Sequence, residues 1–325
     1  AGYIGSHIYL SLYNKGYKPI ILDNFSRSNL QIIGNIKKIT KEDVVYENCD
    51  LRNTEKVIDL LNKYKISTVV HLAAFKSIDE SVLEPLLYYD NNINSLISLL
   101  SALKKSNCKN LIFSSSASLY KQNKNDDYSY SEKDPIECIN PYSETKLICE
   151  KIISDYSKSN QLNYIILRYF NPAGSHESNL ISEMSDDSPK NLFPYIMKVL
   201  LNIQPYLRVF GDNYNTIDGS GVRDYIHIDD LVEGHISALL KLNEKNMNTI
   251  INLGSGVGFS VFEVIKSFEK VSKKTINYKV LPRRNGDKAS IYANIKFAED
   301  TLKWKPKRTL LDICSSCWTS KKSKL

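Results

Sequence analysis

This 325-residue chain has no apolar stretch of the length that a membrane-spanning helix needs, so no helical membrane span is expected. Its cysteines lack the spacing of a disulfide framework, so we expect reduced thiols and a cytoplasmic location. Cys314 and Cys317 have no second pair of cysteines or histidines nearby, which argues against a zinc site, and no metal is expected. The six cysteines are Cys49, Cys108, Cys138, Cys149, Cys314 and Cys317.

The chain also lacks a large cluster of positive charge. Its formal net charge is +7, but the lysines are scattered, and only the residues from Lys321 to Lys324 form a small basic run. This distribution argues against nucleic-acid binding and favours a small anionic ligand held by a few arginines. The length is sufficient for one large or two modest domains with a sizeable core.

The sequence does contain a short buried strand that is followed by polar side chains. The apolar residues Leu111 to Phe113 predict this strand, and Ser114 to Ser116 follow at its carboxyl end. Open α/β sheets bind their ligands at that edge. Further along, Tyr142 and Lys146 are four residues apart at the start of a helical pattern, so both side chains share one helix face.

These side chains suit the transfer of hydride to or from an alcohol carbon. Keeping a tyrosine as phenolate near pH 7 costs roughly 4 kcal/mol, and an ammonium about 4 Å away offsets a similar amount. Lys146, helped by an oxidised nicotinamide, can therefore make Tyr142 a base, while Ser116 holds the same substrate oxygen. Two other Tyr-x-x-x-Lys pairs begin at Tyr120 and Tyr292, but neither opens a long amphipathic helix after a serine-bearing strand.

The start of the chain predicts part of a dinucleotide site. Gly2 and Gly5 precede a helix predicted over residues 6–15, and a strand predicted over residues 17–22 ends at Asp23. An acidic side chain at this spacing accepts the adenosine ribose hydroxyls and repels a 2′-phosphate, which favours NAD over NADP. Taken alone, Gly-x-x-Gly also fits an ordinary helix start, Asp23 fits a turn, and Arg27 nearby is compatible with a phosphate.

Strands and helices alternate over much of the chain. Further strands are predicted over residues 44–46, 68–74, 164–169 and 249–253, and helices over 54–64, 85–105 and 143–158. Residues 68–74 are almost uniformly apolar, as a strand buried on both faces requires. Gly254 to Gly256 are expected to form a turn and not a second nucleotide loop. This pattern predicts an α/β protein with a doubly wound parallel sheet.

In many of these segments the chain resembles the nucleotide-sugar epimerases and dehydratases of the extended short-chain dehydrogenase/reductase superfamily, and among them the 4-epimerases of UDP-hexoses. The similar segments run in order along nearly the whole chain: residues 1–7, 21–24, 88–92, 113–117, 141–146, 167–172, 221–227, 252–258 and 283–287. That family has a strand and a further glycine before the segment that starts here at Ala1. We therefore interpret the chain as truncated and expect a Rossmann-like sheet whose first, central strand is missing.

The resemblance implies which residues bind NAD and the UDP-sugar. For NAD they are Gly2, Tyr3, Ile4, Gly5, Asp23, Asn24, Asp50, Leu51, Leu72, Ala73, Ala74, Lys76, Asn91, Ser114, Tyr142, Lys146 and Phe170. For the UDP-sugar they are Lys76, Ser116, Tyr142, Asn171, Asn191, Leu192, Arg208, Phe210, Arg223, Arg284 and Asp287. The guanidinium groups of Arg223 and Arg284 suit the diphosphate. Asp287 is expected to hold a ribose hydroxyl or to position Arg284, and Arg208 departs from the small residue that is common at its position.

The resemblance also implies the domain organisation and the reaction. We expect an NAD-binding Rossmann domain over residues 1–170, and a smaller, interleaved α/β substrate domain over residues 171–325. A homodimer through helices 85–105 and 143–158 is also expected. The reaction implied is the inversion of carbon 4 in UDP-glucose and UDP-galactose through a 4-keto sugar, with NAD recycled. Ala117 and Ser118 stand where dehydratases carry an acidic pair, which argues against dehydration. Another nucleotide-sugar epimerase or dehydratase, or an inactive truncated NAD-binding relative, stays open. So does the acceptance of N-acetylhexosamines, since Ile291 is intermediate in bulk.

Overall fold

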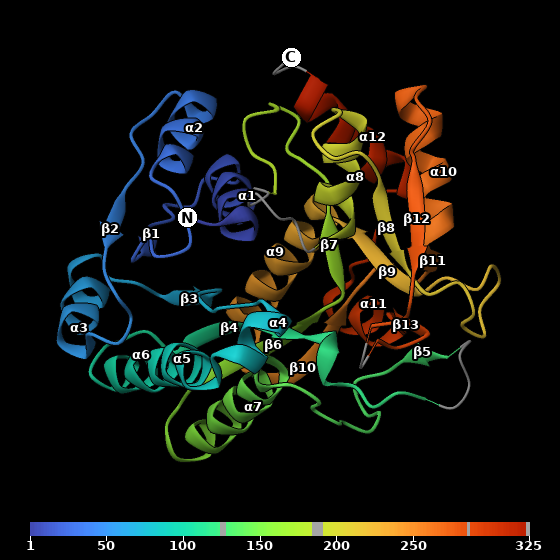
Figure 1. Cartoon of the computed structure of the whole chain (residues 1–325). Helices are drawn as coiled ribbons and strands as arrows, with labels where there is room; N and C mark the ends of the chain where they lie inside the picture. Colours follow the sequence, from blue (N-terminus) through green and yellow to red (C-terminus); the bar gives the residue numbers. More distant parts are fainter. Residues whose placement is uncertain (124–127, 184–190, 285–286, 323–325) are drawn as a thin grey trace. The chain divides into compact units, whose positions relative to one another are not determined.

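The structure, a computed structural model, describes the chain except for residues 124–127, 184–190, 285–286 and 323–325 (Figure 1). It contains two compact units. The first comprises Ala1–Lys121, Glu132–Tyr169 and Gly234–Asn252, and the second comprises Gln122–Ser131, Phe170–Glu233 and Leu253–Leu325. The division therefore differs in two places from the boundary at residue 170 that the resemblance implies. Gln122–Ser131 belongs to the second unit, and Gly234–Asn252 belongs to the first.

The parallel sheet of the first unit is divided into two parts (Figure 1). β1 (Ile21–Asp23) pairs in parallel with β2 (Tyr46–Asn48). The other part has the order β10-β6-β4-β3, formed by β3 (Thr68–His71), β4 (Asn110–Ser116), β6 (Asn163–Tyr169) and β10 (Asn248–Leu253). No strand within the described ranges joins β1 to β3. The sheet is therefore interrupted between β1 and β3.

One consequence of the break is that a prediction for β3 is wrong. Residues 68–74 were expected to form a strand buried on both faces, but β3 ends at His71, and Thr68 to Val70 are only partly buried. β4 is the strand that pairs with β3 in this sheet, so β3 lies at its edge. A strand needs neighbours on both sides for full burial, and its own sequence does not reveal whether both are present.

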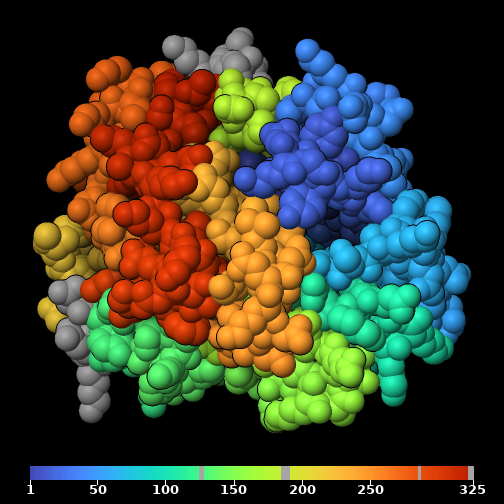
Figure 2. Space-filling view, turned by 180° about the vertical axis from the view of Figure 1, so that it is seen from behind, coloured from blue at the N-terminus to red at the C-terminus, as the bar shows by residue number. Residues whose placement is uncertain are grey.

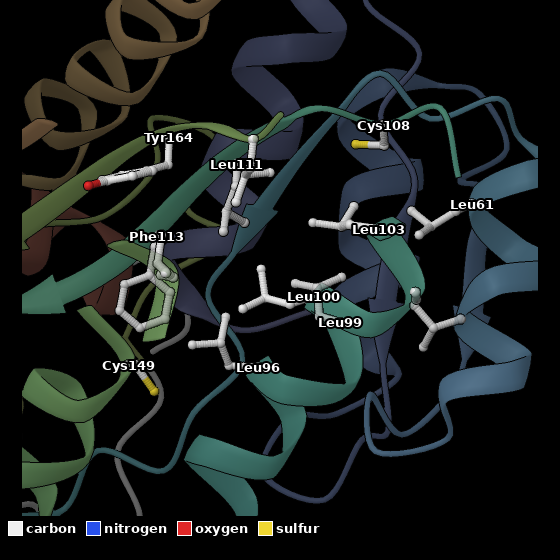
Figure 3. Close-up of a cluster of buried hydrophobic side chains, with 14 of the residues drawn as sticks. Leu61, Leu96, Leu99, Leu100, Leu103, Cys108, Leu111, Phe113, Cys149 and Tyr164 are labelled. Atoms are coloured by element: carbon white, nitrogen blue, oxygen red, sulfur yellow. The ribbon is translucent and has the colours of Figure 1, made fainter. Parts of the chain in front are cut away.

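Leucine side chains of α6 (Ser95–Lys104) form the centre of the first unit's core (Figure 3). Leu96, Leu99, Leu100 and Leu103 follow the helical period and form one stripe, which is almost completely buried. The stripe belongs to the same cluster as Leu111 and Phe113, which alternate onto one face of β4. Burying each such side chain stabilises the fold by roughly 2 kcal/mol, so this core fixes the strand that carries the three serines.

The remaining helices of the first unit agree only in part with the predictions: those that begin at Tyr3, Thr54 and Pro141 start within three residues of the predicted positions, whereas those that begin at Gln31 and Ile78 were not predicted. They are α1 (Tyr3–Asn14), α2 (Gln31–Thr40), α3 (Thr54–Lys63), α4 (Ile78–Leu83), α5 (Pro85–Tyr89) and α7 (Pro141–Ser159), and α9 (Ile228–Glu244) enters this unit at Gly234. The single helix predicted over residues 85–105 is divided into α5, a π-helical turn over Asp90–Asn94, and α6. Such wide turns are common at functional sites.

The second unit has its own sheets and its own core. β11 (Gly258–Ser260), β9 (Val222–His227), β13 (Ser290–Ala293) and β5 (Ser129–Tyr130) form one sheet in that order, with β7 (Asn171–Ala173) also paired to β9. β8 (Leu207–Phe210) pairs in parallel with β12 (Tyr278–Leu281). The helices are α8 (Leu192–Leu200), the start of α9, α10 (Val261–Ser272), α11 (Lys296–Leu302) and α12 (Leu310–Lys322). α12 packs beside α10, as the red and orange segments of Figure 2 show.

Candidate functional site

The carboxyl end of β4 and the first turn of α7 bring Ser116 and Tyr142 together. Asn140 caps α7, because its side-chain Oδ1 accepts a hydrogen bond of 2.9 Å from the Ser143 N–H. Pro141 follows at the first helical position, so the helix begins at a defined residue, one position before Tyr142. The Tyr142 hydroxyl is hydrogen-bonded to the side chain of Ser116.

Lys146 lies one turn further along α7 and is buried, with 4% of its surface exposed. Its Nζ donates a hydrogen bond of 2.8 Å to the backbone oxygen of Ser114 and lies 5.0 Å from the centre of the Phe113 ring. Burial lowers the pKa of Lys146 to about 8, although Cys149 and Glu150 act in the opposite direction. Burial also raises the pKa of Tyr142, while its hydrogen bond to Ser116 lowers it. An ammonium charge is therefore held in the core directly beside the strand end.

A second group of predicted residues lies around the ends of β1 and β2. The Asp23 carboxylate accepts hydrogen bonds from the Phe25 N–H and the Ser28 hydroxyl, and its other oxygen lies 2.9 Å from the amino group of Ala1. Asn24 donates a hydrogen bond of 2.9 Å from Nδ2 to Asp50. The structure thus brings Asn24 and Asp50 into contact.

Arg52 is a residue of this region that the sequence analysis missed. Its Nε and Nη2 atoms lie 2.9 and 2.8 Å from the two carboxylate oxygens of Asp50, and it also contacts Asp90. These hydrogen bonds hold the pKa of Asp50 well below its usual range. The spacing Asp-Leu-Arg was the available signal, but an arginine two residues from an aspartate is common on any surface.

Arg27 was the residue that kept a cofactor with a 2′-phosphate possible. In the structure, its side chain contacts other residues of the protein. Its guanidinium forms an ion pair of 2.6 Å with Glu80 and lies 4.6 Å from the centre of the Phe75 ring. Phe75 belongs to the segment after β3, where Leu72, Ala73, Ala74 and Lys76 are the predicted cofactor residues. Lys76 is exposed, and the Leu72 side chain lies beside Gly5 of α1.

Asn92, the neighbour of the predicted Asn91, connects three segments. Its Oδ1 accepts hydrogen bonds from the Phe75 N–H (2.8 Å) and from Asn91 Nδ2 (3.0 Å). Its Nδ2 donates to the Phe75 oxygen and to Thr145 Oγ1, both at 3.1 Å. All four hydrogen-bonding positions of this buried amide are therefore used. The π-helical turn around Asn92 contacts both the segment after β3 and α7, and a helical pattern alone could not reveal this.

In the second unit, Arg223 of β9 forms the centre of a polar cluster. Its Nη1 donates hydrogen bonds of 2.8 Å to the backbone oxygens of Val222 and Lys288, and its Nη2 lies 3.5 Å from Asp287 Oδ1. The structure thus pairs the Asp287 side chain with Arg223, whereas its backbone N–H donates to the Arg284 oxygen. Ile291, the position that bears on the acceptance of N-acetylhexosamines, lies on β13 and pairs with Arg223 on the adjacent strand β9.

Arginine side chains also lie against aromatic rings near β8. The Arg284 guanidinium lies 3.8 Å from the centre of the Phe210 ring, and Arg208 lies 5.3 Å from that of Tyr195. Arg208 and Phe210 are two residues apart on one strand and therefore face the same side. Arg283, which was not predicted, lies 4.0 Å from the Tyr214 ring centre. These planar groups suit stacking against a base and contact with phosphate oxygens.

The turn from Gly254 to Gly256 binds a carboxylate of the protein itself. Buried Asp224 accepts hydrogen bonds from the N–H groups of Ser255, Gly256 and Ala293 and from the Ser255 hydroxyl, at 2.6 to 3.1 Å. A Cβ atom at Gly254 would lie 2.4 Å from Asp224 Oδ2. Glycine is therefore required there for this internal contact, and the prediction of a turn is confirmed.

The other predicted residues of the second unit are separated along the chain. Asn191 precedes α8, and its Nδ2 donates a hydrogen bond of 2.6 Å to Glu183, while Leu192 is the first helical residue. Asn171 begins β7 and is exposed, and the buried Phe170 donates its N–H to the Leu253 oxygen at 3.1 Å. Part of the segment 283–287, one of those that resemble the family, lies outside the described residues.

Two features are absent from the described residues. No group of three or more His, Cys, Asp or Glu side chains is placed to hold a metal ion there. In the same part of the chain, no helix combines the length and the apolar composition that are needed to cross a membrane.

Comparison with known proteins gave matches along nearly the whole chain. The family model described as GDP-mannose 4,6 dehydratase matches residues 1–317. UDP-glucose 4-epimerase 2 of Arabidopsis thaliana is 41% identical over 323 residues, which cover 98% of this chain and 92% of the relative. UDP-glucose 4-epimerase of Bacillus subtilis is 41% identical over 319 residues, which cover 98% and 94%. A UDP-glucose 4-epimerase of Stenotrophomonas maltophila, crystallised with NAD and formylated UDP-arabinopyranose, has a TM-score of 0.96 at 37% identity and covers 100% of this chain and 96% of its own.

Proposed function

We propose that this chain, which belongs to the UDP-glucose 4-epimerase family within the NAD-dependent nucleotide-sugar epimerases and dehydratases, interconverts UDP-glucose and UDP-galactose by inversion at carbon 4. The observation that carries the proposal is the contact of Tyr142 with Ser116 beside the buried ammonium of Lys146. A phenol, a hydroxyl and an ammonium at one strand end are the groups that proton removal from a sugar hydroxyl requires.

The residues of the first unit fit NAD. A Cβ atom built at Gly2, the N-cap of α1, meets nothing within 4 Å, so a phosphate can approach the first N–H groups of this 12-residue helix. Asp23 at the end of β1 is suited to the adenosine ribose, and Asn24 with Asp50 borders the adenine. With NAD bound, its nicotinamide would supply reversible acceptance of the carbon-4 hydride, so the cofactor would not be consumed.

Tyr142 acts as the base in the first half of the reaction and as the acid in the second. Because burial raises the pKa of its hydroxyl, the phenol releases its proton only when positive charge lies near. Lys146, one turn further along α7, is the side chain expected to provide one such charge, and an oxidised cofactor would add another. Ser116 holds the sugar oxygen during both proton transfers. The 4-keto sugar must turn before hydrogen returns to its other face, so its own contacts have to be weak.

The second unit holds the UDP part of the substrate. Arg223 and Arg284 bind the diphosphate, and Phe210 with Arg208 lies against the base. Asn171, Asn191 and Leu192 complete the set that the family suggests. Firm binding of this part lets the sugar turn without leaving the protein, since binding energy from a non-reacting group retains the intermediate.

A second copy of the chain is the proposed partner. Leu83 and Leu86 are 78% and 81% exposed, and Val82 and Ile97 are 60% and 45% exposed. All four lie in the segment from α4 to α6, and α4 and α5 pack against α7. Apolar side chains concentrated in one helical segment mark an interaction surface, which supports a homodimer through these helices. The six free cysteines support a location in the cytoplasm.

The proposal is tested by incubating the chain with NAD and UDP-galactose and following UDP-glucose by chromatography. Because β1 and β3 lie in separate sheets, the assay is run on this chain and on a form with a strand and a glycine-rich turn added before Ala1. We expect conversion, and loss of conversion in Tyr142→Phe. Folded protein that binds NAD and converts nothing in either form would overturn the proposal.

A further inference from the structure

Ser114 connects the catalytic lysine to two residues that the mechanism does not use. Lys146 Nζ donates to the Ser114 backbone oxygen at 2.8 Å and lies 3.5 Å from the Ser114 hydroxyl. Hydrogen bonding to the same serine side chain acts to lower the pKa of Tyr169, against the larger effect of burial. Tyr169 in turn contacts Nε2 of His235 through a short hydrogen bond. A chain of polar groups therefore runs from Lys146 to His235.

This polar chain is closed to solvent and belongs to four different elements. Lys146, Ser114, Tyr169 and His235 are at most 9% exposed. They come from α7, β4, β6 and α9, all within the first unit. Buried polar groups are stable only when each is hydrogen-bonded. Removing a hydrogen-bonding group at one end of this chain therefore weakens the hydrogen bond of its neighbour.

The direction of the hydrogen bonds depends on His235. Burial raises the pKa of Tyr169 far above its ordinary value, so this hydroxyl keeps its proton and can donate. If Nε2 of His235 accepts from Tyr169, Tyr169 accepts from Ser114, and the Ser114 oxygen is left to accept from Lys146. Each donor then has one acceptor, and the lone pairs of Ser114 face the ammonium.

Other groups near Lys146 cannot easily take over this role. Glu150 lies one turn further along α7, but its carboxylate already accepts hydrogen bonds from Ser115 and from two nitrogens of Arg168. His71 is kept neutral, because burial and the nearby Lys146 lower its pKa to about 3. The orientation of the Lys146 ammonium therefore depends strongly on Ser114.

We propose that Tyr169 and His235 are positioning residues, which orient the Ser114 hydroxyl and thereby fix the Lys146 ammonium where it can act on Tyr142 and on bound NAD. This inference rests on the proposed function only for its effect on turnover. The orientation of Lys146 is a property of the chain in any case. Because both residues act through Lys146 in this proposal, the effect should appear in kcat and not in the KM for UDP-galactose.

The decisive variant is Tyr169→Phe, which removes one hydroxyl and keeps the ring that lies 5.2 Å from the ring of His235. We expect kcat to fall five- to tenfold, with the KM for UDP-galactose changed less than twofold. His235→Leu should behave similarly. His235→Gln, which places an acceptor near Nε2, should recover at least half of the lost kcat.

Tyr120→Phe is the matched control. Tyr120 is also completely buried, and its hydroxyl is hydrogen-bonded to Asn252 at 2.6 Å and to Arg168 at 3.1 Å. Its removal should lower stability but leave kcat unchanged. An unchanged kcat in Tyr169→Phe, or an equal loss in Tyr120→Phe, would overturn the inference.

A second measurement separates this inference from the proposed function. The ¹⁵N resonance of the Lys146 ammonium can be followed in the chain without substrate. We expect it to shift in Tyr169→Phe and in His235→Leu, and to stay in place in Tyr120→Phe. If the chain epimerises UDP-galactose neither as it is nor with the added strand and turn, the proposed function fails, and the resonance still decides the inference. A resonance that does not move in either variant would refute it.

Discussion

Replacing Arg168 by methionine should destabilise the first unit by an amount that depends strongly on pH. Arg168 and Glu150 form an ion pair of 2.7 Å, with only 2% and 5% of their side chains exposed. Methionine retains most of the aliphatic volume of arginine, so the change mainly removes the charge and its hydrogen bonds. Glu150 then keeps the hydrogen bond from Ser115 but loses both bonds from the guanidinium.

The magnitude follows from what Glu150 can do next. Removing one partner of a buried ion pair typically costs about 3–5 kcal/mol. A glutamate can avoid part of this cost by taking up a proton, which requires about 4 kcal/mol at pH 7 but only about 1 kcal/mol at pH 5. Tyr120 and the Glu132 backbone oxygen also lose a donor, which adds about 1 kcal/mol at either pH. We therefore expect a loss of about 5 kcal/mol at pH 7 and about 2 kcal/mol at pH 5.

The assay must report on the first unit. The two tryptophans, Trp304 and Trp318, belong to the second unit, so their fluorescence is unsuitable. Hydrogen exchange of peptides from β4, β6 and α7, measured by mass spectrometry, gives the free energy of opening there. Each variant is compared with the unchanged chain at the same pH.

Two further variants make the test sharper. Glu150→Gln leaves Arg168 without its carboxylate, and because a guanidinium does not release its proton, the loss should be the same at pH 5 and pH 7. The double variant should be less destabilised than the sum of the single ones. A cost of Arg168→Met that is equal at both pH values, or below about 1 kcal/mol at pH 7, would refute this reasoning.

Four other predictions concern single residues of the two units. Tyr142→Phe should retain bound NAD, measured by absorbance, yet lower turnover at least about a hundredfold; turnover near that of the unchanged chain would remove Tyr142 from the role of base. Asp23→Ala should weaken NAD binding about tenfold in calorimetry, and unchanged affinity would show that the ribose lies elsewhere. With a pKa of about 8, Lys146 is charged below pH 8 and loses its proton above it, so NAD affinity should fall as the pH rises through 8; Lys146→Met should bind weakly at every pH. Asp224→Asn offers an N–H group to donors that need an acceptor, which should cost the second unit about 2–4 kcal/mol in an unfolding experiment followed by tryptophan fluorescence.

Local patterns in the sequence were sufficient for the strand and helix that carry the proposed catalytic residues. The apolar run at Leu111 predicts β4, and the helical pattern from Ser143 predicts α7 to within two residues of its start at Pro141, because these signals lie within the elements they define. Features that depend on distant contacts could not be predicted in this way. The π-helical turn forms around Asn92, whose partner Phe75 is 17 residues away.

The same distinction applies to the site. Serine, tyrosine and lysine were predicted from their order and spacing, and a family resemblance supplied the arginines of the second unit. The hydrogen bond between Tyr169 and His235 joins residues 66 positions apart. Neither residue has a neighbouring sequence signal that suggests the other, so only the folded chain reveals that they meet.

The exchange of segments between the two units has a consequence for the synthesis of this chain on the ribosome. β6 receives part of its hydrogen bonding from the segment before β10, where Tyr164 N–H donates to the Met247 oxygen at 2.8 Å. The first unit is therefore completed only after residue 252 has emerged, well after its proposed catalytic residues. β5 is synthesised much earlier, but it cannot form its parallel pairing until β13 of the second unit has been synthesised. At a translation rate of about 5–20 residues per second, both units spend seconds incomplete. A gene divided at residue 170 would produce two fragments that each lack a strand.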